Sequence, residues 1–539
     1  EKEISANICL NKFKNDYINF YNSSEESKNY LYQITKQQNL LSIRKMMDLY
    51  GDFLLKLFPC WLLSPESVST IFPLKKEMFD IILFDEASQV FIENTLPTIY
   101  RGKHIVVAGD SKQLRPSATF VKRYMGNDSD EELDLAIQAA LEVESLLDLS
   151  TSRLNSTNLT YHYRSKSEEL INFSNYAFYD GRLQVAPNVT KNIGNKPIER
   201  IKVNGRWIGR KNEEEAQAIV QLLKKLIKNK RNKSSIGIIT FNTEQETAIE
   251  DAIDNECQKD SAFRDVYIRE QNRKENNEDT SIFIKNLENV QGDERDIIIF
   301  SIGYAQNEYG RVVAHFGPLS QEGGENRLNV AITRAKEKIY VVTSIEPEEL
   351  VVEGSKNAGP KIFKSYLKYV RAISNKNNKE AGFILDSFKS ALPETKETFV
   401  GGQLENEIKD ELIKLGYTVE TNLGNTDYKL SLAIYNKKLD RYLLGIECDY
   451  SAFKSSDSIL ERDVYRNKFL KSRGWDIMRV WSRDWWLNKN KVISNIVKVI
   501  NANLKKYTKP KAGETKTEII DKTKANRNEP KTKNNNQDN

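Results

Sequence analysis

Two adjacent carboxylates, Asp85 and Glu86, directly follow an apolar run in the stretch ILFDEASQV, residues 82–90. Such a run is typical of a buried strand in a parallel sheet, and the carboxyl ends of these strands open into the crevice where α/β sheets bind ligands. An Asp at that place can hold Mg²⁺, and a neighbouring Glu can polarise an attacking water. The alternative is a helix N-cap, because an acidic residue at a strand–helix junction stabilises the first helical turn.

A second apolar run, in HIVVAGDSKQLRP at residues 104–116, also ends in a polar cluster. Its Gln113 carries a neutral amide, which near a terminal phosphate can report whether that phosphate is present. Taken alone, the segment is better explained as a Gly-Asp turn.

Two arginines follow later in the chain. Arg164 lies in LTYHYRS, and Arg334 lies in RLNVAITRAKEKIYVV, within a helical pattern that leads into another strand. Between them, NVQGDERDIIIFS combines a glycine turn, acidic residues and an apolar strand. Arginine supplies the planar fork that stabilises charge on a transferring phosphoryl group. Each arginine taken singly is more simply explained as a surface or ion-pair residue.

The order of these blocks resembles the order of motifs II to VI in superfamily 1 helicases, in particular the senataxin-like branch. The blocks are DEASQ, GDSKQLRP, YHYRS, VQGDERD and LNVAITRAK, and the resemblance covers about residues 55–350. It implies RecA-like domains, the use of ATP and Mg²⁺, and action on nucleic acid, with DNA as the expected substrate.

The resemblance implies a role for each matching residue. Asp85 would coordinate Mg²⁺, Glu86 would activate water, and Gln113 would sense the γ-phosphate. Arg164 and Arg334 would act as arginine fingers. Four further residues would support the nucleotide or the nucleic-acid strand: Glu294 near the ribose, Gly292 where the backbone comes close, and Thr333 and Gln291 as additional contacts.

The phosphate-binding GxxxxGK[ST] loop of such enzymes does not occur in this sequence. The family carries that loop upstream of the DEASQ block, so we expect it to precede Glu1 or to be supplied by a separate chain. Because its backbone N–H groups and its lysine form the main phosphate cradle, we expect the isolated chain to hydrolyse ATP poorly.

A second candidate site lies in the strand RYLLGIECDY, residues 441–450. Glu447 and Asp449 are two positions apart and therefore point to the same side of a strand. That arrangement can hold a divalent cation for phosphodiester cleavage. The alternative is a solvated strand end.

The C-terminal region resembles the Vsr-like branch of PD-(D/E)xK nucleases. The matching residues are Glu405, Glu447, Asp449, Arg462, Asp463, Arg466, Trp475 and Asp484. The resemblance implies a nuclease site at Glu405, position 431, Glu447, Asp449 and Asp463, with the metal at Glu447 and Asp449. Two positions depart from the pattern: Ser431 stands where the family has a metal-binding Asp, and Lys454 where it has a His. Two alternatives stay open: a live nuclease whose site is completed by Asp427 or Glu405, and a degenerate domain that only binds DNA.

Composition limits the other classes of function. The ten Lys and Arg and five Asp and Glu of residues 505–539 account for the whole net charge of +5, so nucleic-acid binding cannot be argued from overall charge. Only three His are present, and the four Cys are scattered without a CxxC pair, which fits a reducing cytoplasm and argues against a zinc site. No apolar run is long enough for a membrane span.

The predicted fold class is α/β, with RecA-like parallel-sheet domains, the first incomplete, followed by a restriction-endonuclease-like α/β domain and a disordered tail. The expected boundaries are a helical segment at 1–55, part of the first RecA-like domain at 56–134, the second at 135–372, a linker at 373–400, the nuclease-like domain at 401–504 and a basic tail at 505–539. We therefore expect an ATP-dependent helicase portion fused to a nuclease-like domain, acting in bacterial defence or DNA repair. A non-catalytic nucleic-acid-binding scaffold is the alternative.

Overall fold

The computed structural model describes most of the chain as two compact units, Glu1–Asn158 and Leu159–Asn539. The described residues are 2–22, 25–116, 145–191, 196–228, 234–276, 278–312, 316–389, 402–424, 429–449 and 458–508.

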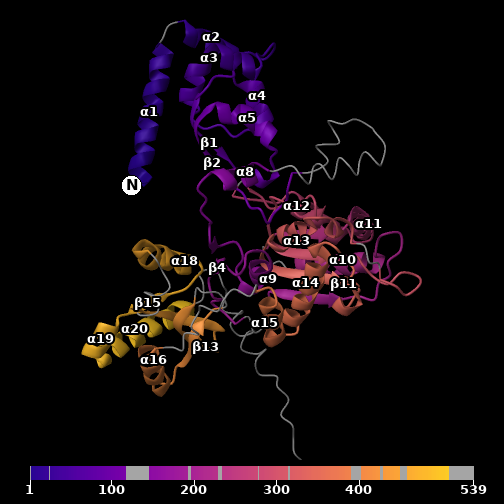
Figure 1. Cartoon of the computed structure of the whole chain (residues 1–539), viewed down its shortest axis with the longest axis vertical. Helices are drawn as coiled ribbons and strands as arrows, with labels where there is room; N and C mark the ends of the chain where they lie inside the picture. The colour runs from indigo at the N-terminus through magenta and orange to yellow at the C-terminus, as the bar shows by residue number, and fades with distance from the viewer. Residues whose placement is uncertain are drawn as a thin grey trace, which may run out of the picture. The chain divides into compact units, whose positions relative to one another are not determined.

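The first unit is mainly helical and contains one small parallel sheet (Figure 1). Its elements are α1 (Lys2–Asn22), α2 (Glu26–Thr35), α3 (Ile43–Leu57), α4 (Pro65–Ile71), β1 (Phe79–Phe84), η1 (Ala87–Gln89), α5 (Ile92–Tyr100), β2 (Gly102–Val107) and α8 (Leu146–Arg153). Helices α1 to α3 confirm the helical content predicted for residues 1–55.

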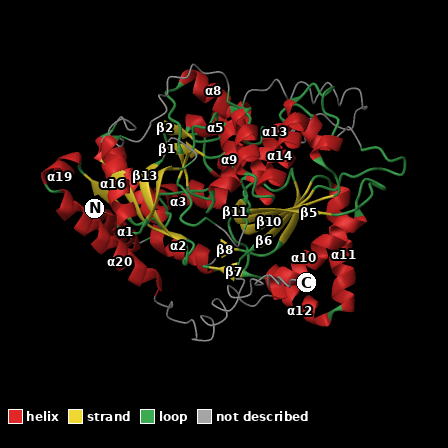
Figure 2. Cartoon of the chain, turned by 90° about the horizontal axis from the view of Figure 1, so that it is seen from below, coloured by secondary structure: helices red, strands yellow, loops and turns green. Residues whose placement is uncertain are grey.

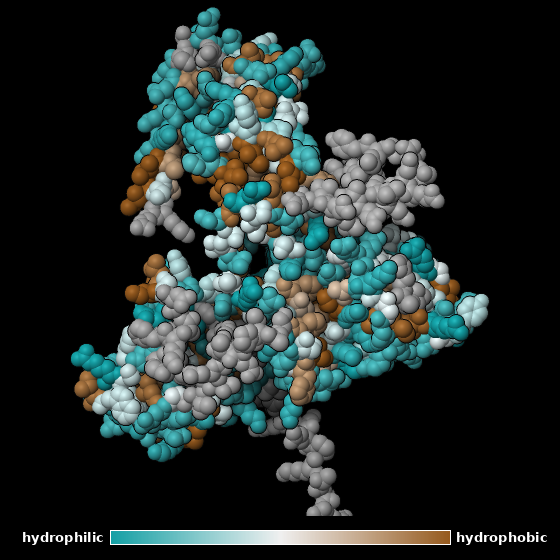
Figure 3. All heavy atoms as spheres, viewed as in Figure 1, coloured by the Kyte–Doolittle hydropathy of each residue, from teal (hydrophilic) through white to brown (hydrophobic). Residues whose placement is uncertain are grey.

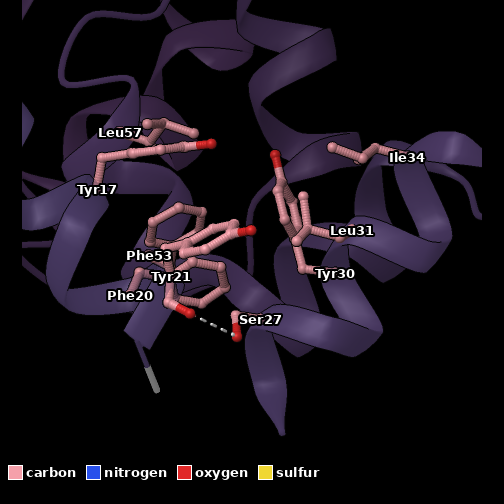
Figure 4. A pocket seen from close by; sticks show the side chains of 9 residues that line it. All are labelled: Tyr17, Phe20, Tyr21, Ser27, Tyr30, Leu31, Ile34, Phe53 and Leu57. Atoms are coloured by element: carbon pink, nitrogen blue, oxygen red, sulfur yellow. Dashed lines mark hydrogen bonds between the residues drawn. The ribbon is translucent and has the colours of Figure 1, made fainter. Parts of the chain in front are cut away.

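Aromatic and aliphatic side chains join the first three helices and surround a cavity of about 220 Å³ (Figure 4). Its lining residues are Tyr17, Phe20, Tyr21, Ser27, Tyr30, Leu31, Ile34, Phe53 and Leu57. The Ser27 hydroxyl donates a hydrogen bond to the backbone oxygen of Tyr21 at 3.3 Å. The cavity has no charged lining residue and is therefore unsuited to phosphate.

The strand β1 pairs in parallel with β2, as predicted, but it is not a buried strand. Ile81 is 61% exposed and Leu83 is 65% exposed, and Val106 of β2 is 48% exposed. Hydrophobic side chains gather on the surface of the first unit (Figure 3). An apolar run shows which side chains avoid water, but it does not show which element covers them.

The second unit begins with an α/β region of parallel strands and helices. Its elements are β3 (Tyr161–His162), α9 (Glu168–Phe178), β4 (Gln184–Val185), β5 (Ile198–Lys202), α10 (Glu213–Lys228), β6 (Ile236–Thr240), α11 (Thr243–Lys259), α12 (Ser261–Gln271), β7 (Lys274–Glu275), β8 (Glu278–Asp279), β9 (Phe283–Asn286), β10 (Arg295–Ser301), η2 (Gly317–Ser320), α13 (Gly324–Ile332), β11 (Ala335–Thr343), η3 (Pro347–Glu349), α14 (Ala358–Ser374) and α15 (Asn378–Asp386).

Five of these strands form one sheet in the order β5-β11-β10-β6-β9, and every pair is parallel. Alternate residues of β10 enter different layers. Ile297 and Ile299 join the core formed with α10, α11 and α12, whereas the ring of Phe300 contacts Tyr366 of α14 on the other face. Figure 2 shows helices on both sides of this sheet. The predicted α/β class with a parallel sheet is confirmed, and helices cover both faces of this sheet.

The C-terminal domain, residues 402–508, contains α16 (Gln403–Lys414), β12 (Thr418–Leu423), β13 (Leu430–Asn436), β14 (Arg441–Cys448), η4 (Glu461–Tyr465), α18 (Arg466–Ser472), β15 (Ile477–Val480), α19 (Ser482–Leu487) and α20 (Lys489–Thr508). Its sheet has the order β12-β13-β14-β15, antiparallel except for the parallel pair β14 and β15. Helices α16 and α20 contribute Ile408 and Ile496 to the core on one face of the sheet.

Three of the predicted boundaries need correction. Helix α8 packs its Leu146 against Phe84 and Ala87, so the chain up to residue 158 belongs with the first unit rather than with a domain that starts at 135. The expected linker at 373–400 includes α15, which buries Ala381 and Leu385. The expected tail begins inside α20, which continues to Thr508. The polar composition of these segments did not indicate a helix, because each of the helices buries only a narrow face.

Candidate nucleotide site and nuclease-like site

Asp85 and Glu86, hereafter the acid pair, lie exposed between β1 and η1. The backbone of Glu86 is left-handed, with φ 52° and ψ 38°, which is uncommon for a residue with a side chain and concentrates at functional sites. Oδ1 of Asp85 accepts a hydrogen bond of 2.9 Å from the Glu86 amide. The Glu86 side chain makes no capping hydrogen bond to η1, so the N-cap alternative is not supported.

The loop after β2 lies beside the acid pair because β1 and β2 are parallel neighbours. The Ala87 amide donates to the backbone oxygen of Ala108 at 3.0 Å. A Cβ on Gly109 would lie 3.1 Å from the Ala87 nitrogen, so glycine permits this close approach. Nε2 of Gln113 donates to Oδ2 of Asp110 at 3.0 Å, which holds the predicted phosphate sensor in the same loop.

In the second unit, the remaining predicted residues other than Arg164 lie at the amino ends of two parallel strands. Gln291 to Glu294 precede β10, while Thr333 and Arg334 precede β11. Helix α13 ends at Ile332, so the expectation that the Thr-Arg pair lies within a helix is wrong. Gly292 has φ 87°, and its surroundings are open, so its conformation rather than space calls for glycine.

Glu294 is held by two cations. Its carboxylate lies 2.7 Å from Nε of Arg164 and 2.7 Å from Nζ of Lys336. Burial alone would raise the pKa of Glu294, but the hydrogen bonds from Lys336 and Arg164 outweigh it and lower the pKa. NH1 of Arg164 also donates to the backbone oxygen of Thr333 at 3.3 Å. The structure therefore brings together residues that are 130 or more positions apart in the sequence.

Arg334 is buried and bonded to its own unit. Nε donates to the Val330 backbone oxygen at 2.8 Å, and NH2 donates to Oγ1 of Thr333 at 3.1 Å. NH1 reaches the backbone oxygen of Asp293 at 3.4 Å. In this conformation the guanidinium ties the two loops together, and Thr333 supports that arginine. The side chain of Arg164 is 34% exposed and is the more accessible of the two predicted fingers.

In the C-terminal domain, Glu447 is buried and paired with two arginines. Its Oε1 lies 2.5 Å from Nε of Arg466, and its Oε2 lies 3.4 Å from NH2 of Arg479. The Glu447 side chain is 2% exposed and that of Arg466 is 9% exposed. Arg479 also pairs with Asp463, so one network of opposite charges connects both carboxylates. The alternative of a solvated strand end is not supported at Glu447, and a cation would have to compete with these arginines.

The other predicted nuclease residues are engaged in hydrogen bonds or buried. Oδ2 of Asp449 accepts from the amide of Ser482 at 3.0 Å. Oγ of Ser431 accepts from the Cys448 amide at 3.2 Å. Glu405 is buried, and within the described part of the chain its Oε1 has no hydrogen-bond partner. Burial, together with the charges of Glu405 and Asp449, raises the pKa of the Cys448 thiol.

No group of three or more His, Cys, Asp or Glu side chains is placed to hold a metal ion in the ranges that the structure describes. Asp427 and Lys454 lie outside those ranges. Arg462 forms a hydrogen bond with Asp463, and Asp484 is exposed in α19. Sequence reasoning did not identify Arg479 as a partner of Glu447. The parallel pairing of β14 with β15, which sets Arg479 opposite Glu447, is seen only in the structure and has no signal in the sequence.

Comparisons with known proteins support the predicted combination of a helicase region and a nuclease-like domain. Residues 142–346 match the family model AAA_12, described as an AAA domain. Residues 404–500 match the family model REase_MTES_1575. The chain therefore joins an AAA-type region to a nuclease-like domain.

Several of the curated relatives are named helicases. The chain is 34% identical over 488 residues to "Uncharacterized ATP-dependent helicase MG140" of Mycoplasma genitalium, which covers 89% of this chain and 42% of that protein. It is 25% identical over 330 residues to "Uncharacterized ATP-dependent helicase MJ0104" of Methanocaldococcus jannaschii, covering 56% and 40%. It is 27% identical over 288 residues to "Probable helicase senataxin" of Homo sapiens, covering 49% and 9%. The resemblance to senataxin-like helicases is confirmed, while the chain spans less than half the length of these relatives.

Among the helices that the structure describes, none has both the length and the hydropathy that crossing a membrane requires.

Proposed function

We propose that the natural protein containing this chain is an ATP-dependent enzyme that translocates on or unwinds nucleic acid, with DNA as its substrate. The observation that carries this proposal is the exposed acid pair in a left-handed turn at the carboxyl end of β1, beside the loop of Gln113. Helicase relatives that cover 89% of the chain support it.

The residues of the first unit fit the binding of ATP with Mg²⁺. Asp85 is an exposed hard oxygen ligand, and a Mg²⁺ bound together with a nucleotide takes most of its ligands from phosphates and water, so it needs no cluster of three protein carboxylates. When bound, the ion supplies charge stabilisation for the phosphates. Glu86 would accept the proton of the attacking water, and Gln113 would contact the terminal phosphate.

The second unit would supply the positive charge. Arg164 would leave Glu294 to reach the phosphates, and the exposure of both side chains makes that exchange feasible. Glu294 would then be available for the ribose. Gln291, Gly292 and Thr333 would shape the loops around these groups. Arg334 would act as a second finger only after leaving the acceptors that hold it within its own unit.

The experiment is a measurement of ATP hydrolysis by the natural full-length protein, with and without single-stranded DNA or RNA. We expect turnover that requires Mg²⁺ and that DNA stimulates at least severalfold. No turnover with either nucleic acid would favour the alternative of a non-catalytic binding scaffold.

For the C-terminal domain we propose binding of DNA without metal-dependent cleavage. A hard cation prefers several charged oxygens. Glu447 is neutralised by Arg466 and Arg479, and position 431 offers only a hydroxyl. The chemistry of this donor set does not fit the metal that a PD-(D/E)xK nuclease uses.

One observation favours a residual nuclease as a second candidate: the unbonded Oε1 of the buried Glu405. A nicking assay on supercoiled DNA with Mg²⁺ separates the two, using the wild type, Ser431→Asp and Glu447→Ala. We expect no cleavage by the wild type and weak cleavage at most by Ser431→Asp, which adds the absent carboxylate. Strong wild-type cleavage that Glu447→Ala abolishes would establish a live nuclease.

The four cysteines form no disulfide, which supports a place in the reducing cytoplasm. Bacterial defence against foreign DNA and DNA repair are the two cellular roles that a DNA translocase with such a domain would fit.

A further inference from the structure

The C-terminal domain is built onto the segment 159–191, which carries Arg164. Ala186 of that segment lies in the same hydrophobic cluster as Tyr442, Phe469 and Trp475 of the C-terminal domain. The rings of Tyr161 and Phe469 lie 4.9 Å apart at an angle of 59°. Because the two regions share buried apolar side chains, the C-terminal domain is packed on this segment rather than merely tethered to it.

Directional hydrogen bonds fix the register of this packing. The indole Nε1 of Trp475 donates to the backbone oxygen of Pro187 at 2.8 Å. The Tyr442 amide donates to the backbone oxygen of Val189 at 2.9 Å. Each contact joins backbone of the segment to the C-terminal domain, so a shift of either partner would break several bonds together.

Arg473 makes the contact nearest to the predicted finger. It follows α18, and its guanidinium donates through NH1 to the backbone oxygen of Tyr163 at 2.8 Å and through NH2 to that of Ser165. These two carbonyls flank Arg164 on either side. The planar fork of the guanidinium donates to both acceptors at once in a fixed geometry, and bonds from a charged donor are stronger than those between neutral groups.

Residues 162–166, hereafter the finger loop, are held on another side by β11. The Lys166 amide donates to the backbone oxygen of Lys336 at 2.7 Å. The Ser165 hydroxyl donates to the Ala335 oxygen at 3.4 Å, and the Ser165 amide donates to Nε2 of His162 at 3.1 Å. The finger loop therefore has two supports, one from the sheet and one from Arg473, while the side chain of Arg164 is left to Glu294 and the Thr333 oxygen.

We propose that Arg473 is a positioning residue for Arg164, and that the C-terminal domain thereby supports ATP hydrolysis. The inference rests on the proposed function, in which the Arg164 guanidinium acts on the phosphates. A finger must be placed to within a fraction of an ångström, and a displacement of about 1 Å can cost on the order of 10²-fold in rate. By fixing the two carbonyls around Arg164, Arg473 restricts where that guanidinium can reach.

The test uses the natural full-length protein with saturating single-stranded DNA. We would measure kcat and KM for ATP in Arg473→Ala, Arg473→Lys, Arg164→Ala and the double variant Arg164→Ala/Arg473→Ala. Arg483→Ala is the matched control, because Arg483 is an exposed arginine of the same domain. Amide hydrogen exchange of the finger loop and the melting temperature are recorded for each variant.

We expect Arg473→Ala to lower kcat by about 10- to 100-fold with little change in KM, and Arg473→Lys to recover only part of it. Exchange of the finger-loop amides should accelerate while the melting temperature stays near that of Arg483→Ala. In the Arg164→Ala background the second substitution should change kcat by less than about twofold, because both act through one guanidinium.

Multiplicative losses in the double variant, or a normal kcat in Arg473→Ala, would overturn the inference. A normal kcat in Arg473→Ala together with a strong loss in Arg164→Ala would overturn only the positioning role of Arg473. The proposed role of Arg164 would stand. An unchanged rate in Arg164→Ala would overturn both this inference and the proposed role of Arg164. If Arg473→Ala does not fold, Arg473→Lys decides: unchanged kcat and unchanged exchange of the finger loop would refute the positioning role.

Discussion

Two Arg–Glu pairs in this chain have similar geometry and opposite surroundings. Arg164 and Glu294 meet at 2.7 Å with side chains that are 34% and 38% exposed. Arg466 and Glu447 meet at 2.5 Å with side chains that are 9% and 2% exposed. An exposed pair contributes little to stability and can exchange partners. A buried pair is costly to break, because the remaining charge stays without compensation.

The same contrast separates the two pairs of acids that ended apolar strands in the sequence. Asp85 and Glu86 are exposed and follow β1 in a strained turn. Glu447 is enclosed by arginines, and Asp449 accepts two hydrogen bonds from Ser482. The chemistry available to a carboxylate is set by its neighbours, so two similar sequence patterns lead to exposed acids in one place and to a network of ion pairs in the other.

The largest effect is expected at the exposed pair. Arg164→Ala should lower ATP turnover by about 10³-fold or more, because an arginine finger contributes roughly 10³–10⁵ in related phosphoryl transfers. Arg164→Lys should recover little, since a point charge does not replace the planar fork. The measurement is steady-state ATP hydrolysis with saturating nucleic acid. A near-normal rate in the lysine variant would mean that Arg164 has a structural role, like Arg466.

The buried pair should respond in stability. Glu447→Ala leaves Arg466 and Arg479 without their buried carboxylate, and the free energy of unfolding of the second unit should fall by about 3–5 kcal/mol. Urea denaturation measures this, with the exposed Glu322→Ala as control. If Glu447→Ala lowers the free energy of unfolding no more than the control does, the buried pair does not contribute more to stability than an exposed residue.

A smaller effect is expected from pH at the finger loop. Burial, followed by the charges of Arg164 and Arg473, lowers the pKa of His162 from 6.5 to about 4. A lowered folded-state pKa means that the unfolded chain binds the proton more readily. The stability contribution is therefore complete above about pH 6.5 and declines toward pH 4, by on the order of 1 kcal/mol per pH unit.

Melting temperatures between pH 7 and pH 4 test this expectation. In His162→Gln the decline should be smaller than in the wild type, whereas His104→Gln, at an exposed histidine of the first unit, should follow the wild type. Identical pH profiles for all three proteins would show that folding does not lower the pKa of His162.

Much of the fold was predictable, because the parallel strands appear in the sequence as apolar runs such as Ile297 to Phe300. The convergence of Arg164, Glu294 and Thr333 was predictable only through the resemblance, since these residues lie far apart in the sequence. The partners of Glu447 were not predictable, because an arginine in a strand gives no sign of which carboxylate it will face. The exposure of β1 was missed for the same reason: burial depends on what covers a strand.

The most direct test of the account is Glu86→Gln in the natural full-length protein. Glutamine keeps the shape of the side chain but cannot accept the proton of the attacking water, so ATP turnover should fall by about 10²–10⁴-fold while ATP binding is preserved. Glu93→Gln, at an exposed glutamate of α5, should leave turnover unchanged. Normal turnover in Glu86→Gln would contradict the account, because the acid pair would then not be the site of hydrolysis.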